Sequence, residues 1–216
     1  MAFVLPNHHI EDGKYKITHQ LLFQTPLFEI NIDDIDNKEL EKNIYKLKDS
    51  SPKGIIKSNH GGWHSIEQSL NMTNSNQIPI GDAFNPLTNK LMDILQCLPF
   101  TPKISKIHNM NIWAMINKKG SYNSTHNHPG CDISGVYYVK VPEGDCGNIC
   151  FTDPRESYVY GNTFFVERYS GGETIPRYPI EGNMYLFPSS FKHLVNTNTT
   201  DEDRIAISFN LGVVWI

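Results

Sequence analysis

Apolar residues recur at helical spacing in two segments of the N-terminal half of the chain. A helix is predicted from Asp36 to about Leu47, and a second from Pro86 to about Cys97. Asp36 and Asn37 stand where the first helix needs a capping side chain. The predicted apolar faces consist of Leu40, Ile44 and Leu47 in the first helix and of Leu87, Leu91, Ile94 and Leu95 in the second.

After residue 103 the pattern changes to short apolar segments separated by Gly, Pro and Asn. Such segments are typical of β-strands joined by turns. The predicted strands are 106–116, 134–141, 147–151, 162–169, 174–180, 183–187, 193–196 and 204–211. Eight strands are the number in a jelly roll, so the pattern predicts a mainly β protein, α+β overall. Its core would be a double-stranded β-helix with the N-terminal helices packed on it.

We predict a single domain over residues 1–216, made of an N-terminal α/β elaboration, 1–102, and a β-helix core, 103–216. Within the elaboration, strands are expected at 15–18, 21–23 and 27–31, and a polar loop at 58–65.

Composition is that of a chain that can bury a core, with 39% apolar residues among 216. The formal charge of -4 disfavours nucleic acid and anionic membranes as partners. No apolar run approaches the roughly 20 residues that span a bilayer, and the N-terminus lacks signal-peptide features, which predicts a cytoplasmic protein. The four cysteines form no C-x-x-C pair and are expected to stay reduced.

Two histidines, His126 and His128, are separated by a single residue, and His193 follows much later. On a strand, residues i and i+2 face the same side, so the first two can offer their imidazoles to one divalent metal ion. A jelly roll brings distant strands together at its mouth, so we expect His193 to complete the site. Asp132 is the nearest carboxylate on the same segment and is an alternative ligand.

Several motifs between residues 103 and 212 resemble, in combination, the 2-oxoglutarate- and iron(II)-dependent oxygenases, specifically the small ones of bacteria and phages, including cyanophages. These motifs are Asn111-Ile-Trp, Asn117-Lys-Lys-Gly-Ser-Tyr-Asn, His126-Asn-His-Pro-Gly, Ser134-Gly-Val-Tyr-Tyr, Phe151-Thr-Asp-Pro-Arg, Phe187-Pro-Ser, His193 and Arg204-Ile-Ala-Ile-Ser-Phe-Asn. The resemblance implies an enzyme that uses Fe(II), 2-oxoglutarate and dioxygen to hydroxylate a C–H bond, with release of succinate and CO2. The substrate, a small molecule or a peptide, is not identified. A phage protein would act in the host cytoplasm.

The resemblance also implies a facial triad of two histidines and one carboxylate around the iron. In this chain His128 stands where the family at large has Asp or Glu. We favour His126, His128 and His193 as the catalytic metal ligands, and Asp132 remains the alternative to His128.

A cation for the far carboxylate of 2-oxoglutarate is the second requirement. Arg204 lies on the strand expected beside the metal, and a guanidinium can bind a carboxylate through two parallel hydrogen bonds. The alternative for Arg204 is a surface ion pair with Asp201, Glu202 or Asp203.

Further candidate contacts to 2-oxoglutarate are Asn117, Tyr138 and Ser208, with Tyr122 a weaker one. Relatives often carry Ser or Thr two positions after the arginine, where this chain has Ala206, and Ser208 lies one strand repeat further.

Around these residues, a Gly-containing loop with His60, Trp63 and His64 would form either a lid over the substrate or a loop anchored by a packed Trp. Arg155 would lie either at the cavity rim or in a turn with a solvated ion pair.

Two other functions fit parts of the pattern. A cupin-type dioxygenase or isomerase would use Asp132 as a fourth ligand and would not need 2-oxoglutarate. A non-catalytic jelly roll would serve as a binding or structural module, but it would not require three convergent histidines with an arginine nearby. Exposed strand edges and the apolar C-terminus, residues 211–216, are compatible with a homodimer.

Overall fold

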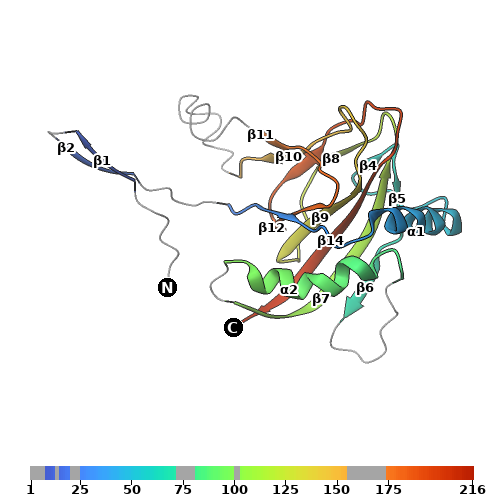
Figure 1. The fold of residues 1–216 in the computed structure, drawn as a ribbon, viewed down its shortest axis with the longest axis horizontal. Coiled ribbons are helices and arrows are strands. Elements are labelled where there is room, and N and C mark those ends of the chain that lie inside the picture. The colour runs from blue at the N-terminus through green and yellow to red at the C-terminus, as the bar shows by residue number, and fades with distance from the viewer. Residues whose placement is uncertain (1–7, 13–14, 20–24, 72–80, 100–102, 155–173) are drawn as a thin grey trace.

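The fold consists of two antiparallel sheets that face each other, with helices outside the larger sheet (Figure 1). The computed structural model describes residues 8–12, 15–19, 25–71, 81–99, 103–154 and 174–216. Its helices are α1 (Asn37–Ser50) and α2 (Asn85–Cys97). Its strands are β1 (His8–Asp12), β2 (Tyr15–His19), β3 (Phe28–Asn31), β4 (Asn59–His60), β5 (Trp63–His64), β6 (Gln68–Asn71), β7 (Ile104–Asn117), β8 (Tyr122–His126), β9 (Ile133–Lys140), β10 (Ile149–Thr152), β11 (Thr174–Arg177), β12 (Asn183–Pro188), β13 (His193–Val195) and β14 (Arg204–Trp215).

The larger, seven-stranded sheet has the order β3-β12-β9-β14-β7-β5, with β6 also paired to β7. The smaller, five-stranded sheet has the order β11-β10-β13-β8-β4. Neighbours in each sheet are mostly distant in sequence, as in a jelly roll, so the predicted mainly β fold is confirmed. In the described part of the chain, β1 pairs only with β2.

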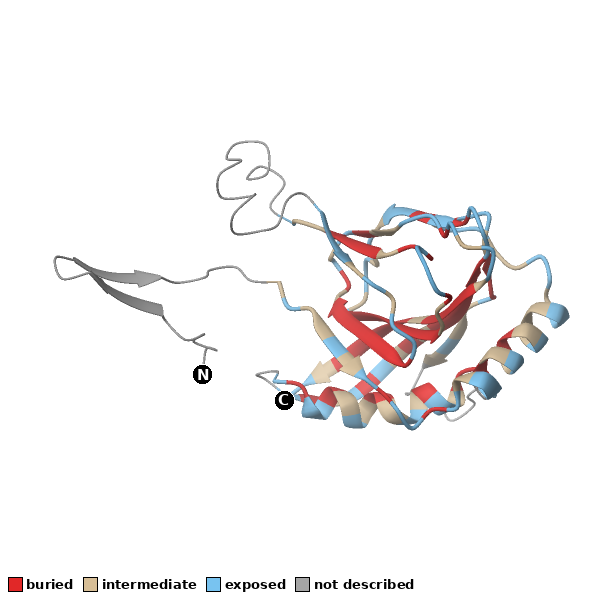
Figure 2. Cartoon of the chain, turned by 45° about the horizontal axis from the view of Figure 1, so that its top comes forward, coloured by how far each residue is buried: buried red, intermediate tan, exposed pale blue. Residues whose placement is uncertain are grey.

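Both helices cover the outer face of the larger sheet, α1 against β9 and α2 against β7 (Figure 2). The Asp36 side chain accepts a hydrogen bond from the Glu39 amide at 3.1 Å, which confirms the expected cap of α1. The apolar faces are buried as predicted, with Leu40 and Ile44 in α1 and Leu87, Leu91 and Leu95 in α2, whereas Ile94 is half-buried.

Strand β14 separates the two halves of the interior by simple alternation. Ile205, Ile207, Phe209 and Leu211 point toward the helices and are fully buried in the main core. The residues between them, Arg204, Ala206, Ser208 and Asn210, point into the space between the sheets. The polar character of three of these four positions marks the inner face as a site.

Most predicted strands of the core are confirmed, with β7 and β14 extending beyond the predicted ends. Predicted strands 21–23 and 162–169 lie outside the described residues. The predicted loop at 58–65 was partly wrong, because it contains β4 and β5. Two residues are too few to show a strand pattern in the sequence. Each of these strands forms by pairing with a longer one, β4 with β8 and β5 with β7.

Residues before position 103 contribute to both sheets. Strand β3 pairs with β12 and β6 with β7 in the larger sheet, while β4 forms an edge of the smaller one. The N-terminal half can therefore carry side chains to the space between the sheets. The division into an elaboration, 1–102, and a core, 103–216, stays a prediction.

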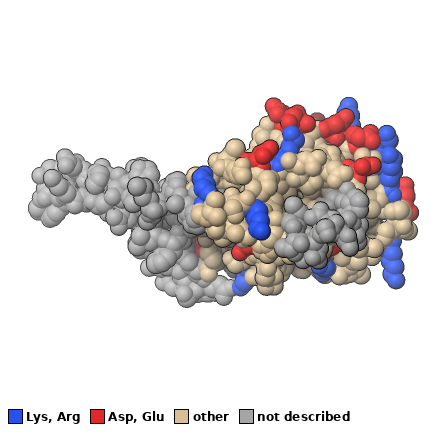
Figure 3. All heavy atoms as spheres, turned by 90° about the horizontal axis from the view of Figure 1, so that it is seen from below, with Lys and Arg blue, Asp and Glu red and all other residues tan. Residues whose placement is uncertain are grey.

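On the face that Figure 3 shows, the visible Lys and Arg side chains are scattered, and the Asp and Glu side chains lie mainly along one edge. Within the described ranges, no helix combines the length and apolar character needed to cross a membrane.

Candidate metal and cosubstrate site

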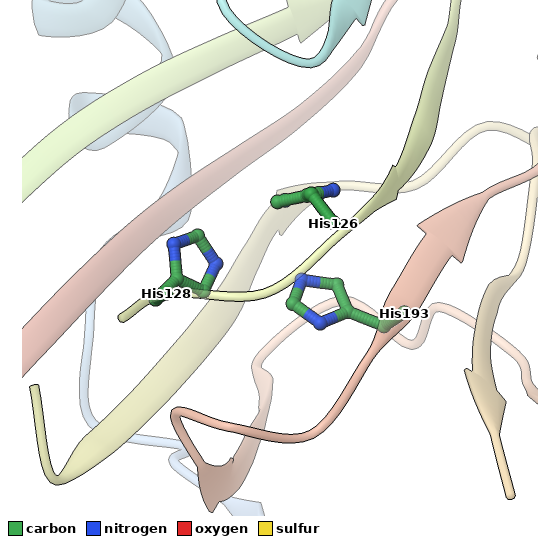
Figure 4. A group of neighbouring side chains, drawn as sticks. All are labelled: His126, His128 and His193. Carbon is green, nitrogen blue, oxygen red and sulfur yellow. The ribbon is translucent and has the colours of Figure 1, made fainter. Parts of the chain in front are cut away.

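Three imidazoles converge at one end of the space between the sheets (Figure 4). His126 ends β8 and His193 begins β13, and the antiparallel register pairs the two directly. His128 is the third member, and one nitrogen from each ring lies within 4.8 Å of those of the others. The structure thus brings together the three histidines that the sequence singled out.

His128 reaches this group by a different route from the one expected. It lies two residues beyond the end of β8, so the same-face argument for strand residues does not apply to it. Its main-chain amide donates instead to the carbonyl oxygen of Ser189 at 2.9 Å, which ties the loop to the end of β12.

Main-chain oxygens orient two of the three rings. His126 Nδ1 lies 2.7 Å from the Ser124 oxygen, and His193 Nδ1 lies 2.9 Å from the Phe191 oxygen. Each Nδ1–H donates to its carbonyl, so the Nε2 lone pair is left for a metal. The ring of His128 instead lies beside the side-chain amide of Asn210, whose Nδ2 is 3.4 Å from His128 Nδ1.

Burial keeps these imidazoles neutral. Burial first, and then the proximity of His126, lower the pKa of His193 to about 3 and that of His128 to about 4. Burial also lowers the pKa of His126. Neutral imidazole is the state that binds a metal ion, so the group is ready to do so at neutral pH without losing protons.

Asp132, the alternative ligand, is not part of this group. Its Oδ2 accepts a hydrogen bond from the Val213 amide at 2.9 Å and so stabilises β14. In the part of the chain that the structure describes, the convergent group contains no carboxylate.

A cavity of about 420 Å³ extends from the three imidazoles into the space between the sheets. Arg204, Tyr138 and Ser208 line it, as the sequence led us to expect. Asn117 lies beside Arg204 on the paired strand but does not line the cavity, and Tyr122 is 41% exposed and lies outside it.

Arg204 is buried, 4% exposed, and has no carboxylate partner among the residues described. Its Nη1 donates to the carbonyl oxygens of Gly147 and Cys146, and its Nε has no partner. Burial lowers its pKa. A guanidinium that is buried without a counter-charge is costly, so the site fits an anionic ligand.

The predicted alternative, a surface ion pair of Arg204, is wrong because the acidic neighbours have other partners. Asp201 binds Lys119 at 2.7 Å, Glu202 lies 3.5 Å from Lys140, and Asp203 accepts from the Tyr45 hydroxyl at 2.9 Å.

Gly147 allows the arginine to sit this deep. It has φ +92°, and a Cβ there would overlap the Asn196 carbonyl oxygen and lie 3.2 Å from Arg204 Nη1.

In the Gly-containing segment, His64 lies in the cavity lining, whereas His60 and Trp63 do not. His64 lines the cavity and stacks on Trp113, with ring centres 5.5 Å apart. Trp63 is a packed anchor, whose Nε1 donates to the Ser51 oxygen at 3.0 Å. His60 stacks on Tyr122 outside the cavity, and Arg155 lies outside the described residues.

Sequence reasoning missed several cavity residues. Ser58 Oγ lies 3.4 Å from His126 Nε2, and Lys57 and Glu67 form an ion pair in the cavity lining. Their segment has no strand pattern to predict this position. Asn210 was also missed, although it shares the alternation of Arg204 and Ser208 along β14, a signal present in the sequence.

Comparison with known proteins gives one family match and a shared fold. Residues 111–210 match a family model described as "Putative 2OG-Fe(II) oxygenase". A prolyl-4-hydroxylase from Pseudomonas putida has the same fold, with 10% identity, TM-score 0.55, and coverage of 87% of this chain and 92% of that one. No curated protein matches the sequence.

Two further solved structures share the fold. A prolyl hydroxylase from Trichoplax adhaerens, in complex with a peptide of hypoxia inducible factor, is 14% identical, with TM-score 0.54 and coverage of 86% and 83%. HygX from Streptomyces hygroscopicus, with nickel and 2-oxoglutarate bound, is 15% identical, with TM-score 0.52 and coverage of 87% and 83%.

Proposed function

We propose that this protein is a 2-oxoglutarate- and iron(II)-dependent oxygenase that hydroxylates a C–H bond of its substrate, since residues 111–210 match the model of that family. In this proposal His126, His128 and His193 hold Fe(II), and Arg204 binds the far carboxylate of 2-oxoglutarate. Succinate and CO2 are the other products. The observation that carries the proposal is a buried guanidinium, without a carboxylate partner among the described residues, in the same cavity as three convergent imidazoles.

The bound iron, with 2-oxoglutarate and dioxygen, supplies the oxidising power that no side chain of the chain has. The protein's part is to bind, orient and exclude water. Three neutral imidazoles leave the charge of Fe(II) uncompensated, and the two carboxylates of 2-oxoglutarate supply the matching negative charge. We therefore expect metal and cosubstrate to bind cooperatively.

Residues on the cavity wall between the three imidazoles and Arg204 are the other proposed contacts to 2-oxoglutarate. Ser208 lies on β14 between Arg204 and Asn210, and we propose that its hydroxyl contacts the cosubstrate. The Tyr138 ring is fully enclosed near Arg204, whose charge opposes the rise in the Tyr138 pKa that burial causes. We propose its phenol as a donor to the same carboxylate.

Asn117 can contribute only with its amide turned. As placed, Nδ2 donates to Asn123 Oδ1 at 3.3 Å and Oδ1 has no partner. A carboxylate needs a donor, so a contact from Asn117 to 2-oxoglutarate would require this amide to turn toward the cavity, and that of Asn123 to turn with it, because two Oδ1 atoms cannot pair.

For the substrate, we propose a small molecule or a peptide. The Trichoplax adhaerens enzyme was solved with a peptide fragment, and HygX was solved with hygromycin B. The cavity is large enough for a cosubstrate and a substrate group together, at about 420 Å³.

A calorimetric titration of 2-oxoglutarate into protein loaded with Mn(II), which resists oxidation, tests the proposal. We expect binding to require the metal, and Arg204→Met to weaken it at least about 30-fold, since removing one partner of a buried charge pair costs roughly 2 kcal/mol or more. The matched control is Arg177→Met on β11, whose Nη1 donates to the Pro176 main-chain oxygen. Equal affinity in Arg204→Met and wild-type protein would overturn the proposal.

A further inference from the structure

His128 is the one imidazole of the three whose orientation does not depend on a main-chain carbonyl. Carbonyl oxygens accept only, so they fix the protonated nitrogen of His126 and His193. The neighbour of His128 Nδ1 is the side-chain amide of Asn210, at 3.4 Å. An amide can either donate or accept, so this contact does not by itself fix the tautomer of His128.

Behind Asn210 lies a buried row of hydroxyl groups. Ser134 Oγ lies 2.7 Å from Asn210 Oδ1 and 2.8 Å from Ser189 Oγ. Both serines are 1% exposed and Asn210 is 9% exposed. The row thus runs from Ser189 through Ser134 and Asn210 to His128, and connects β12, β9 and β14 to the metal group.

The direction of this row can reverse. As placed, Ser134 donates to Asn210 Oδ1, and Asn210 Nδ2 faces His128 Nδ1, which then accepts. If the amide turns, its oxygen accepts from His128 Nδ1–H and its nitrogen donates to Ser134. Hydroxyl groups donate or accept equally well, so Asn210 and Ser134 stay hydrogen-bonded in both arrangements.

We infer that Asn210 is a positioning residue for His128, which turns its amide oxygen toward Nδ1–H so that the opposite nitrogen of the ring faces the metal. This inference rests on the proposed function, because it takes His128 as a ligand. It explains how an imidazole fills a place where the family at large has a carboxylate. The partner that orients it comes from the inner face of β14, the strand that also carries Arg204.

Metal affinity measured with Co(II) tests the inference without relying on turnover. Partners that orient a metal-binding histidine typically contribute about 10–100-fold in affinity, so we expect Asn210→Ala to weaken Co(II) binding by that factor. Asn210→Asp, which supplies an oxygen that only accepts, should bind at least as tightly as wild-type protein. Asn111→Ala is the matched control. Asn111 is paired with Asn210 across β7 and β14 and lines the same cavity, but its Oδ1 accepts from Ser69 at 2.7 Å.

A double-mutant cycle separates positioning from a general structural effect. If Asn210 acts through His128, Asn210→Ala should have no further effect on Co(II) affinity once His128→Ala is present. An equal loss in both backgrounds would overturn the inference, as would a single Asn210→Ala variant with wild-type affinity. Thermal unfolding of the metal-free variants identifies any that fail to fold, and in that case Asn210→Ser replaces Asn210→Ala.

The same measurements keep this inference apart from the proposed function. If His128→Ala binds Co(II) like wild-type protein, the proposed ligand set is wrong. If His128→Ala loses affinity and Asn210→Ala does not, the ligand set stands and only the role of Asn210 falls.

Discussion

His193 pairs directly with His126 across the antiparallel strands β13 and β8, and the centres of the two rings lie 4.4 Å apart. The strand pairing supports this position, because His193 also pairs with Phe151 of β10, so that β13 lies between two strands. Two of the three proposed ligands are therefore positioned by the sheet itself, and the third by a loop and an amide.

Removal of one member of the pair should abolish tight metal binding. We expect His193→Ala to weaken Co(II) binding by more than about 100-fold, beyond the loss typical for partners outside the coordination sphere. Equilibrium titration with a competing chelator measures it. His108→Ala, an exposed histidine on β7, is the control. Unchanged affinity in His193→Ala would mean that the metal, if any, binds elsewhere.

Acid should destabilise the metal-free protein. The pKa of His193 is about 3 in the folded protein, against an ordinary value of 6.5 that the unfolded chain regains. Below pH 6.5 the unfolded chain binds a proton that the folded protein does not, so the free energy of unfolding falls as pH decreases toward 3. The slope is up to about 1.4 kcal/mol per pH unit for such a group.

Urea denaturation between pH 7 and pH 4.5 measures this effect. Over this range His193→Ala should show a shallower pH dependence than wild-type protein. A variant with the same slope would show that His193 is not the source.

Gly147→Ala should weaken the Arg204 site by more than the cost of a positive φ at an alanine. The added methyl group meets the Asn196 carbonyl oxygen and approaches Arg204, so we expect a loss of about 1–3 kcal/mol in unfolding free energy and weaker 2-oxoglutarate binding. Gly144→Ala is matched, because Gly144 has a similar φ of +96° but its Cβ would meet only Thr200 Cγ2, at 3.4 Å. Similar losses in both variants would contradict the role given to Gly147.

Asp132→Ala should affect stability and leave metal binding intact. The carboxylate accepts from the Val213 amide, and hydrogen bonds to charged groups contribute roughly 1.5–3 kcal/mol. We expect that loss in denaturant unfolding, with Co(II) affinity equal to wild type. A large loss of affinity would restore the cupin-like alternative, in which Asp132 is a ligand.

Much of this site follows from local patterns in the sequence. Alternation along the strand of Arg204 places Ser208 and Asn210 on the same inner face, and the turn-separated segments predict the jelly roll that brings His193 to His126. Local patterns could not place His128, because its position depends on a long-range hydrogen bond to Ser189. Local patterns could not place Ser58 or His64 either. Ser58 directly precedes β4 and His64 lies in β5, and both short strands form only by pairing with longer strands.

The three imidazoles belong to the smaller sheet and its adjoining loop, whereas Arg204 belongs to the larger sheet. An acid held at both ends, as we propose for 2-oxoglutarate, must match the gap between the sheets, so the proposed site would select dicarboxylates by length. Shorter acids reach one wall only, and longer ones must bend. One aromatic pair spans this gap, Phe151 on β10 of the smaller sheet against Phe187 on β12 of the larger sheet, with ring centres 4.9 Å apart. In this proposal the choice of cosubstrate depends on core packing, at residues that need not contact the metal.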